Sequence, residues 1–146
     1  MGVGPPDTGV DPRPVPDHDA TTAFFWEGAA AGQLLLQRCR QCRRFQYPPD
    51  VACTFCQSED LEVTRLSGSG TVYSFAVVNR PLHPGFRTKL PYIVAIVELD
   101  EQPGLRMLTN LLEVVQEEVT IGMPVEVTFE GRGTVTLPQF RPRKAR

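Results

Sequence analysis

The second half of the chain divides into short runs rich in β-branched and aromatic residues, separated by Gly, Pro and charged residues. Runs of this length and composition, bounded by turn residues, are typical of strands. Residues 112–119 lie between the third and fourth runs and are expected to form one short helix that ends before Gly122. We expect five strands, at residues 71–78, 92–99, 105–110, 125–130 and 135–137.

Five strands with a helical insert between the third and the fourth match the OB-fold. This fold is a small, partly open barrel that binds ligands on one face and through its loops. The sequence therefore predicts a mainly β protein whose C-terminal half is a five-stranded OB-fold barrel.

One stretch before the barrel has the pattern of a helix. An Asp or Thr just before residue 22 can cap a helix that stops at Gly32. Phe24, Phe25 and Trp26 are consecutive, so they cannot all lie on one side of it. In one interpretation the rings pack on two neighbouring elements. In the other, the helix lies in a groove or against a partner protein, where exposed rings serve as anchors.

All four cysteines of the chain lie in two CxxC pairs. A CxxC turn directs two sulfurs into one small volume, and two facing turns supply the four thiolates of a tetrahedral Zn²⁺ site. A redox-active CxxC normally occurs singly beside a βαβ pattern, and nothing in this sequence reads as βαβ. Four cysteines alone do not distinguish zinc from iron. We expect a structural metal site, Zn²⁺ or iron, held by Cys39, Cys42, Cys53 and Cys56.

Short strands flank the cysteine pairs. Residues 34–38 lead into the first pair, residues 45–47 return from it, and residues 61–64 alternate as a strand after the second pair. This is the pattern of a zinc ribbon, which has too little core to fold unaided. Metal binding, worth roughly 10–16 kcal/mol in small zinc modules, would stabilise it. Four protein sulfurs leave no open position for substrate, so we expect the metal to do no chemistry.

Composition and charge limit the classes of partner. Hydrophobic residues make up 41% and charged residues 22% of the chain, as in a soluble globular protein, and no apolar run approaches the roughly 20 residues that span a membrane. The net charge of −2 and the pI of about 5.7 argue against a nucleic-acid partner. Residues 1–18 are rich in Pro, Gly and Asp and lack the apolar segment of a secretory signal. We expect a disordered leader and a cytoplasmic protein.

The sequence does not contain a recognisable catalytic set. His18 lies in the leader and His83 in a loop, and no motif places a nucleophile beside either. The Gly-Ser-Gly at residues 68–70 lacks the strand-to-helix context of a nucleophile elbow. The carboxylate pairs at residues 100–101 and 117–118 are expected to be solvated. We expect no catalytic residue in this chain.

The loop at residues 79–89 has features of a contact surface. It is long for a link between barrel strands, and it mixes cations with the apolar Leu82 and Phe86. Such a mixture suits a ligand with a phosphorylated head and an acyl tail, or a protein partner; the alternative is a solvated loop. Arginines also crowd the first cysteine pair, where they either compensate the thiolates or contact phosphates.

The order of these motifs resembles the DUF35 family, in which a rubredoxin-like zinc ribbon precedes an OB-fold. The resemblance covers about residues 20–142. The matching residues are Phe25-Trp26-Glu27-Gly28, Leu35 to Cys39, Cys42, Pro48-Pro49, Cys53, Cys56, Gly68, Gly70 to Ser74, Arg80-Pro81, Leu90-Pro91-Tyr92, Ile121 to Val125, Leu137-Pro138 and Phe140-Arg141-Pro142.

The resemblance implies an acyl-CoA-associated accessory protein. Members pair with thiolase-like enzymes, including lipid-transfer-protein-like aldolases of bacterial steroid side-chain degradation, and the thiolase-like subunit carries the catalytic residues. The implied function is a non-catalytic subunit that binds and stabilises such an aldolase or an acyltransferase, with acyl-CoA at or near the interface. A stand-alone acyl-CoA-binding protein and a module that binds single-stranded nucleic acid are the alternatives.

These expectations define segments and candidate residues. The expected segments are a leader (1–18), an N-terminal aromatic helix (19–33), a zinc ribbon (34–66), an OB-fold (67–141) and a basic tail (142–146). The candidate contacts for a partner or acyl-CoA are Phe24, Phe25, Trp26, Arg44, Arg80, His83, Phe86, Arg87 and Lys89.

Overall fold

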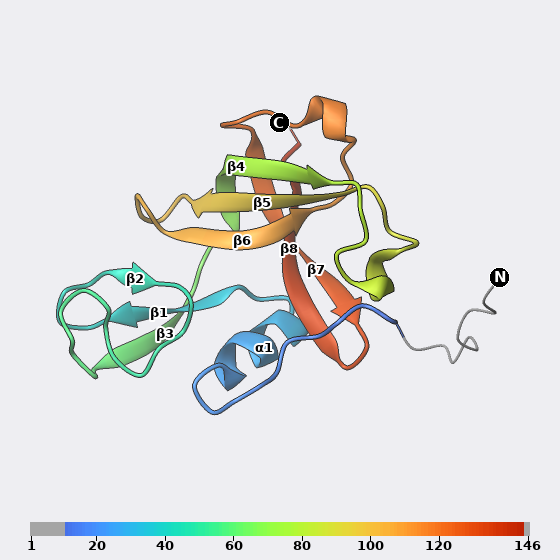
Figure 1. The fold of residues 1–146 in the computed structure, drawn as a ribbon. Helices are drawn as coiled ribbons and strands as arrows, with labels where there is room; N and C mark the ends of the chain where they lie inside the picture. Colours follow the sequence, from blue (N-terminus) through green and yellow to red (C-terminus); the bar gives the residue numbers. More distant parts are fainter. Residues whose placement is uncertain (1–10, 145–146) are drawn as a thin grey trace.

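The computed structural model describes residues 11–144, which form a small three-stranded sheet, a closed barrel and one α-helix (Figure 1). Helix α1 (Ala23–Ala30) packs against both the small sheet and the last strand of the barrel. No helix in residues 11–144 is long and apolar enough to cross a membrane. The mainly β class predicted from the sequence, with an N-terminal helix, a zinc ribbon and an OB-fold barrel, is confirmed.

The small sheet carries the two cysteine turns. Its central strand pairs antiparallel with both neighbours, and its register with the third strand runs from Leu35 opposite Arg65 to Cys39 opposite Leu61. The side chains of Leu36 and Cys39 are fully buried, so the central strand anchors the first cysteine turn in the core. The sheet has the order β2-β1-β3, with β1 Leu35–Cys39, β2 Phe45–Gln46 and β3 Leu61–Arg65.

The barrel closes because its fourth strand pairs antiparallel with both the fifth and the first. The sequence predicted a partly open barrel, and the pairing of Ser69–Thr71 with Pro124–Glu126 closes it. Alternate side chains of the second strand point inward, as expected for a strand with one face on a core. The order is β4-β5-β6-β8-β7, with β4 Ser69–Val78, β5 Tyr92–Leu99, β6 Arg106–Leu111, β7 Pro124–Arg132 and β8 Val135–Pro142.

One continuous hydrophobic core joins the ribbon, the helix and the barrel. Phe25 of α1 and Leu36 of the ribbon belong to the same buried cluster as Val97 and Phe140 of the barrel. Leu66, between β3 and β4, is also buried in this cluster. The ribbon therefore packs on the barrel through apolar contact, which fixes the position of the cysteine turns relative to the barrel.

The helix predicted at residues 112–119 does not form. The structure has a single 3-10 turn, η2 (Gln116–Glu118), after Glu113, whose φ is +56°. That left-handed conformation interrupts any helix that starts at residue 112. A second 3-10 turn, η1 (Pro84–Phe86), lies in the long loop between β4 and β5.

Residues 11–16, which belong to the predicted leader, contact the barrel. Arg13 donates to the carboxylate of Glu130 at 3.4 Å, and the carbonyl of Pro14 accepts from Arg132 at 3.3 Å. The carbonyl of Pro12 lies directly over Gly85. The first ten residues of the predicted leader lie outside the described residues.

The predicted basic tail begins inside the last strand. Pro142 is the final residue of β8, and the Arg143 guanidinium lies 3.8 Å from the carboxylate of Asp100. Residues 145–146 of the tail lie outside the described residues.

Candidate metal centre and contact surfaces

The four cysteine sulfurs converge on one point between the two turns. All four Sγ atoms lie within 4.8 Å of one another, and the pairs Cys39–Cys56 and Cys42–Cys53 are each separated by 3.6 Å. A tetrahedron of sulfurs about 2.3 Å from a central ion has edges of roughly 3.8 Å. The arrangement therefore fits a tetrahedral metal ion with four protein ligands.

Backbone N–H groups around the sulfurs favour thiolates. The Cys39 Sγ accepts from the N–H of Cys42 at 3.5 Å, and the Cys53 Sγ accepts from the N–H groups of Phe55 and Cys56 at 3.4 Å each. The Cys42 N–H lowers the pKa of Cys39 to about 6. These bonds place both buried sulfurs in the form that binds metal.

The fourth sulfur shows why the cage needs a cation. Although the backbone N–H of Ser58 favours the Cys56 thiolate, burial and the neighbouring cysteines raise the pKa of Cys56 to about 11. Four thiolates this close repel one another unless a cation lies between them. A divalent ion at the centre removes that repulsion, so the donor set fits a structural metal.

The arginines beside the cage are held mainly by nearby carboxylates. Arg40 lies 3.1 Å from Asp60 and 3.3 Å from Glu62, and Arg43 lies 3.8 Å from Glu62. Arg38 instead donates to the backbone carbonyl of Arg43 at 2.9 Å. Arg40 and Arg43 are thus paired with carboxylates, and neither predicted role, compensation of the thiolates or contact with phosphates, is shown by these contacts.

Arg44 differs from its neighbours. Its guanidinium lies 4.8 Å above the ring of Phe55, which is itself half exposed, and within residues 11–144 it forms no ion pair. A cation over an exposed ring remains available to an anionic ligand. Arg44 stays a predicted contact residue.

Two buried glutamines support the metal site and were not recognised from the sequence. Gln37 of β1 and Gln46 of β2 are buried, and together they bind the backbone of Asp50, Ala52 and Thr54. That segment leads into the second cysteine turn. A glutamine in the strand on each side of the first cysteine pair was the available signal, but periodicity does not show what these side chains contact.

The aromatic helix packs mainly on neighbouring elements. Phe25 is 3% exposed, and its ring lies 4.9 Å from Trp26 and 5.6 Å from Tyr47. Phe24 and Trp26 are partly buried against the same core. The structure therefore has the first of the two predicted arrangements for Phe25, whose buried ring is not an exposed anchor. The roles of Phe24 and Trp26 as contacts stay predictions.

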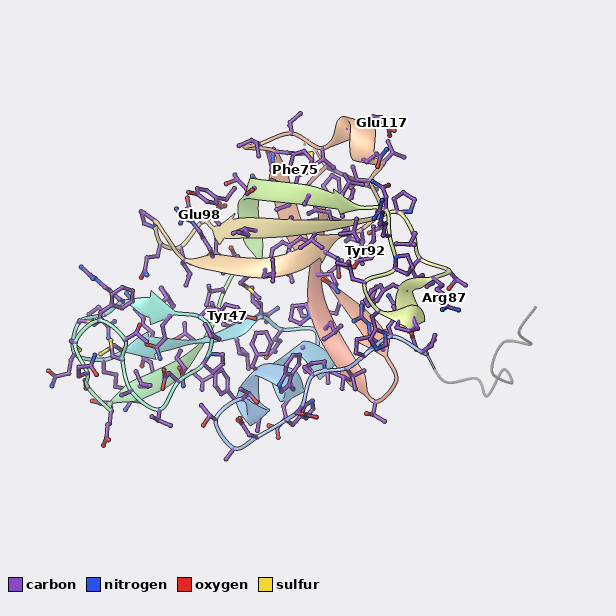
Figure 2. The ribbon with its side chains drawn as sticks, in the orientation of Figure 1. Tyr47, Phe75, Arg87, Tyr92, Glu98 and Glu117 are labelled. Carbon is purple, nitrogen blue, oxygen red and sulfur yellow. The ribbon has the colours of Figure 1, made fainter. Side chains whose placement is uncertain are left out.

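The loop between β4 and β5 presents cations beside apolar groups. Arg80, Arg87 and Lys89 are exposed, and none forms an ion pair in the part of the chain that the structure describes. Arg87 is labelled in Figure 2 at the outer side of this loop. His83 caps η1 because its Nδ1 accepts a hydrogen bond from the N–H of Gly85 at 3.0 Å. This ring nitrogen is therefore already engaged in a hydrogen bond within the loop.

Phe86 turns inward from the same loop. Its ring lies 4.8 Å from that of Tyr92 and 5.6 Å from the guanidinium of Arg132. The loop thus has an outer, cationic side and an inner aromatic residue that fixes it to the barrel. The predicted contact residues Arg80, His83, Arg87 and Lys89 all lie in this loop and are exposed, while Arg44 lies on the ribbon.

Two family models match adjoining parts of the chain. The model described as the ChsH2 rubredoxin-like zinc ribbon domain matches residues 26–62. The model described as the ChsH2 C-terminal OB-fold domain matches residues 63–130. Together they cover the cysteine site, the first three strands of the barrel and most of the fourth.

Two curated relatives are hydratase subunits. The chain is 41% identical over 131 residues to a probable enoyl-CoA hydratase alpha subunit of Thermomonospora curvata. The matched region covers 89% of this chain and 40% of the relative. The chain is 39% identical over 125 residues to the 3-oxo-4,17-pregnadiene-20-carboxyl-CoA hydratase alpha subunit of Mycobacterium tuberculosis, covering 86% of this chain and 39% of the relative. The chain therefore spans about two fifths of the length of these relatives.

One solved structure matches most of the chain. The chain resembles one chain of the Ltp2-ChsH2(DUF35) aldolase with a TM-score of 0.78 and 39% sequence identity. The similarity covers 88% of this chain and 98% of that one. Ribbon and barrel thus occur together, in this arrangement, in a second protein.

Proposed function

Because the chain belongs to the ChsH2 (DUF35) family of zinc-ribbon and OB-fold proteins, we propose that it is a non-catalytic accessory subunit. Its partner is a thiolase-like aldolase or acyltransferase that acts on acyl-CoA thioesters. The chain binds this enzyme and stabilises its fold, and the enzyme supplies the catalytic residues.

The closed sulfur cage is the observation that carries this proposal. Four cysteine sulfurs within 4.8 Å of one another fill a tetrahedral coordination sphere. An ion held in this way has no open position for water or substrate and cannot act as a Lewis acid. We assign Zn²⁺ to the site, held by Cys39, Cys42, Cys53 and Cys56, because it favours tetrahedral thiolate ligation. Its effect is to stabilise the ribbon.

The outer side of the β4–β5 loop is the proposed contact surface. Leu82 is 79% exposed at its tip, and Arg80, Arg87 and Lys89 are exposed around it. An exposed apolar side chain surrounded by cations suits a protein interface beside the phosphates of a CoA. The structure thus supports a binding role for this loop without a catalytic one.

The names of similar proteins support the choice of substrate class. One relative acts on a CoA thioester of a pregnadiene carboxylic acid, and the similar solved structure is an aldolase. We infer a steroid-derived acyl-CoA as the substrate of the assembly, with the CoA at or near the contact between the two subunits.

Co-expression with a thiolase-like protein from the same genome tests the proposal. We expect a stable complex on gel filtration and higher aldolase or acyltransferase activity than the thiolase-like protein has alone. Leu82→Asp should weaken the complex, whereas Val63→Asp, at a site that is 52% exposed on the ribbon, should leave it intact. A partner that is fully active alone and forms no complex would contradict the proposal.

Calorimetry distinguishes the stand-alone alternative. If the isolated chain is a subunit, it binds acyl-CoA weakly until its partner is added. Tight binding of several acyl-CoAs by the chain alone would favour an independent carrier instead.

A further inference from the structure

A cavity of about 340 Å³ lies between helix α1, the ribbon and the outer face of the barrel. Aromatic side chains dominate its walls: Phe25 and Trp26 from α1, Tyr47 from the ribbon, Phe86 from η1 and Tyr92 from β5. Tyr47 and Tyr92, both labelled in Figure 2, line it from the ribbon and from the barrel. The volume is that of a site for a small organic ligand.

Two buried N–H donors in the walls have no acceptor. Within residues 11–144, neither Nε1 of Trp26 nor Nε of Arg132 has a hydrogen-bond partner, and Arg132 is 7% exposed. Buried polar groups are almost always paired, because an unpaired donor loses its hydration without compensation. Both donors belong to side chains that line the cavity, so a ligand with an oxygen acceptor that reached them would restore their pairing.

The side-chain amides of the cavity and the Thr109 hydroxyl are already paired. Gln139 accepts from the Thr109 hydroxyl at 2.9 Å and from the N–H of Asn110 at 2.8 Å. These bonds leave the two unpaired donors as the groups that would select a ligand, together with the hydroxyls of Tyr47 and Tyr92, which form no hydrogen bond within residues 11–144. The rest of the wall is apolar, so the body of the ligand must be apolar too.

Local charge excludes an anionic ligand. The Arg132 guanidinium lies 3.0 Å from the carboxylate of Glu130, which also lies 3.4 Å from Arg13. Arg13 in turn lies 2.6 Å from Asp11. Two cations and two carboxylates make a neutral cluster, so a carboxylate ligand would add an unbalanced negative charge to a buried place. A neutral oxygen meets the donors without this cost.

The ordered leader covers the cavity. The carbonyl of Pro14 accepts from Arg132, Pro16 lines the cavity, and the ring of His18 stacks on Trp26 at 5.4 Å between centroids. Pro14 and His18 thus contact the side chains of Arg132 and Trp26, and Pro16 lies in the cavity wall. A ligand that reaches both donors must shift this segment.

We propose that this cavity binds a small apolar molecule that carries an uncharged oxygen acceptor, such as a cyclic ketone, and that residues 12–18 are its displaceable cover. The site belongs to this chain alone and does not depend on a thiolase-like partner. A result on either proposal leaves the other untouched.

The single tryptophan makes the binding directly measurable in the full chain. Trp26 gives one indole N–H resonance in a ¹H–¹⁵N spectrum, and titration with cyclooctanone should shift it downfield and saturably as the ketone accepts its hydrogen bond. Cyclooctanecarboxylate, of nearly the same size, should bind about tenfold more weakly or less. No saturable shift with the ketone up to its solubility limit, or equal affinity for both, would overturn the proposal.

A pair of matched variants locates the site. Leu108 lines the cavity and is 68% exposed, so Leu108→Glu leaves the core intact while it places a charge at the mouth. Ile121 is 64% exposed and lies outside the cavity lining, so Ile121→Glu is the control. We expect Leu108→Glu to weaken ketone binding about tenfold and Ile121→Glu to leave it unchanged. Equal effects of the two variants would place the ligand elsewhere and overturn the assignment.

Gly85→Ala tests the cover. A Cβ at Gly85 would meet the carbonyl of Pro12 and come within 2.8 Å of the Cα of Arg13, so the substitution pushes the leader outward. Gly85 itself does not line the cavity. We expect tighter ketone binding than in the wild type. Unchanged or weaker binding would show that the leader is not a cover.

Discussion

The side-chain amide of Gln46 donates to the side-chain carbonyl of Gln37 at 2.7 Å across the buried face between β1 and β2. Each glutamine then binds the backbone that leads to the second cysteine turn. Gln37 makes two bonds with Asp50, and Gln46 bonds to Ala52 and Thr54. The pair therefore holds one cysteine turn in position opposite the other.

Replacement of Gln46 by Leu should destabilise the metal-loaded protein by about 1–3 kcal/mol. The leucine fits the buried site in size but leaves the N–H of Thr54 and the carbonyl of Ala52 without partners. Denaturant unfolding monitored by Trp26 fluorescence measures the change. Gln116→Leu, at an exposed position on η2, is the control and should be nearly neutral. Equal stabilities of the two variants would show that the glutamine pair has no supporting role.

The sulfur cage predicts that Cys53→Ser gives insoluble or metal-free protein. The hydroxyl is a poor substitute for a thiolate, and three sulfurs hold the ion too weakly to offset the entropy of ordering the ribbon. Metal analysis of freshly purified wild type should give one ion per chain. Ser74→Ala, at an exposed position in β4, should keep that content. Wild-type protein with well under one ion per chain would contradict the assignment.

Sequence patterns predicted those parts of the structure that are determined by residues close together in the chain. The CxxC spacing predicted the metal site, because the turn itself aims both sulfurs. Runs of β-branched residues predicted β4 and β5, because the preference of these residues for extended backbone is also a local property. Residues 112–119 were predicted as a helix because their composition permits one, but the positive φ of Glu113 has no clear local signal.

The remaining features depend on residues far apart in the chain. Arg13 is ordered by Glu130, 117 positions later, so a leader that looks disordered by composition is held by tertiary contacts. The cavity likewise combines α1 with β5, β6 and β8. Periodicity within one segment contains no information about such neighbours.

The burial of Tyr47 predicts a loss of stability in alkaline solution. Burial raises the pKa of Tyr47 above its ordinary value of 10.0, because the phenolate would lose its hydration. The folded state thus holds the proton more tightly than the unfolded chain. The protonated Tyr47 therefore contributes its full share to the stability of the fold below about pH 10. This contribution is lost as the pH rises through the folded-state pKa.

A spectroscopic titration at 295 nm checks this prediction. The difference between wild type and Tyr47→Phe isolates the ionisation of Tyr47, whose midpoint should lie above 10. The stability of Tyr47→Phe should also fall less steeply than that of the wild type over this range. A midpoint at or below 10 would mean that the ring is open to water.

Gln102 gives the last prediction, because it joins the barrel to the ribbon by hydrogen bonds. It lies in the turn between β5 and β6, accepts from the N–H of Phe45 at 2.8 Å and donates to the carbonyl of Phe45 at 3.0 Å. These two bonds extend the pairing of β2 toward the barrel. Gln102→Ala removes both and leaves two backbone groups of the ribbon unpaired.

We expect Gln102→Ala to speed hydrogen exchange at the Phe45 amide and to lower the free energy of unfolding by about 1–2 kcal/mol, with metal content unchanged. Gln116→Ala is the matched control on the surface. If the apolar core alone fixed the ribbon to the barrel, exchange at Phe45 would match the wild type in both variants. Faster exchange only in Gln102→Ala would show that this side chain couples the metal module to the barrel that it supports.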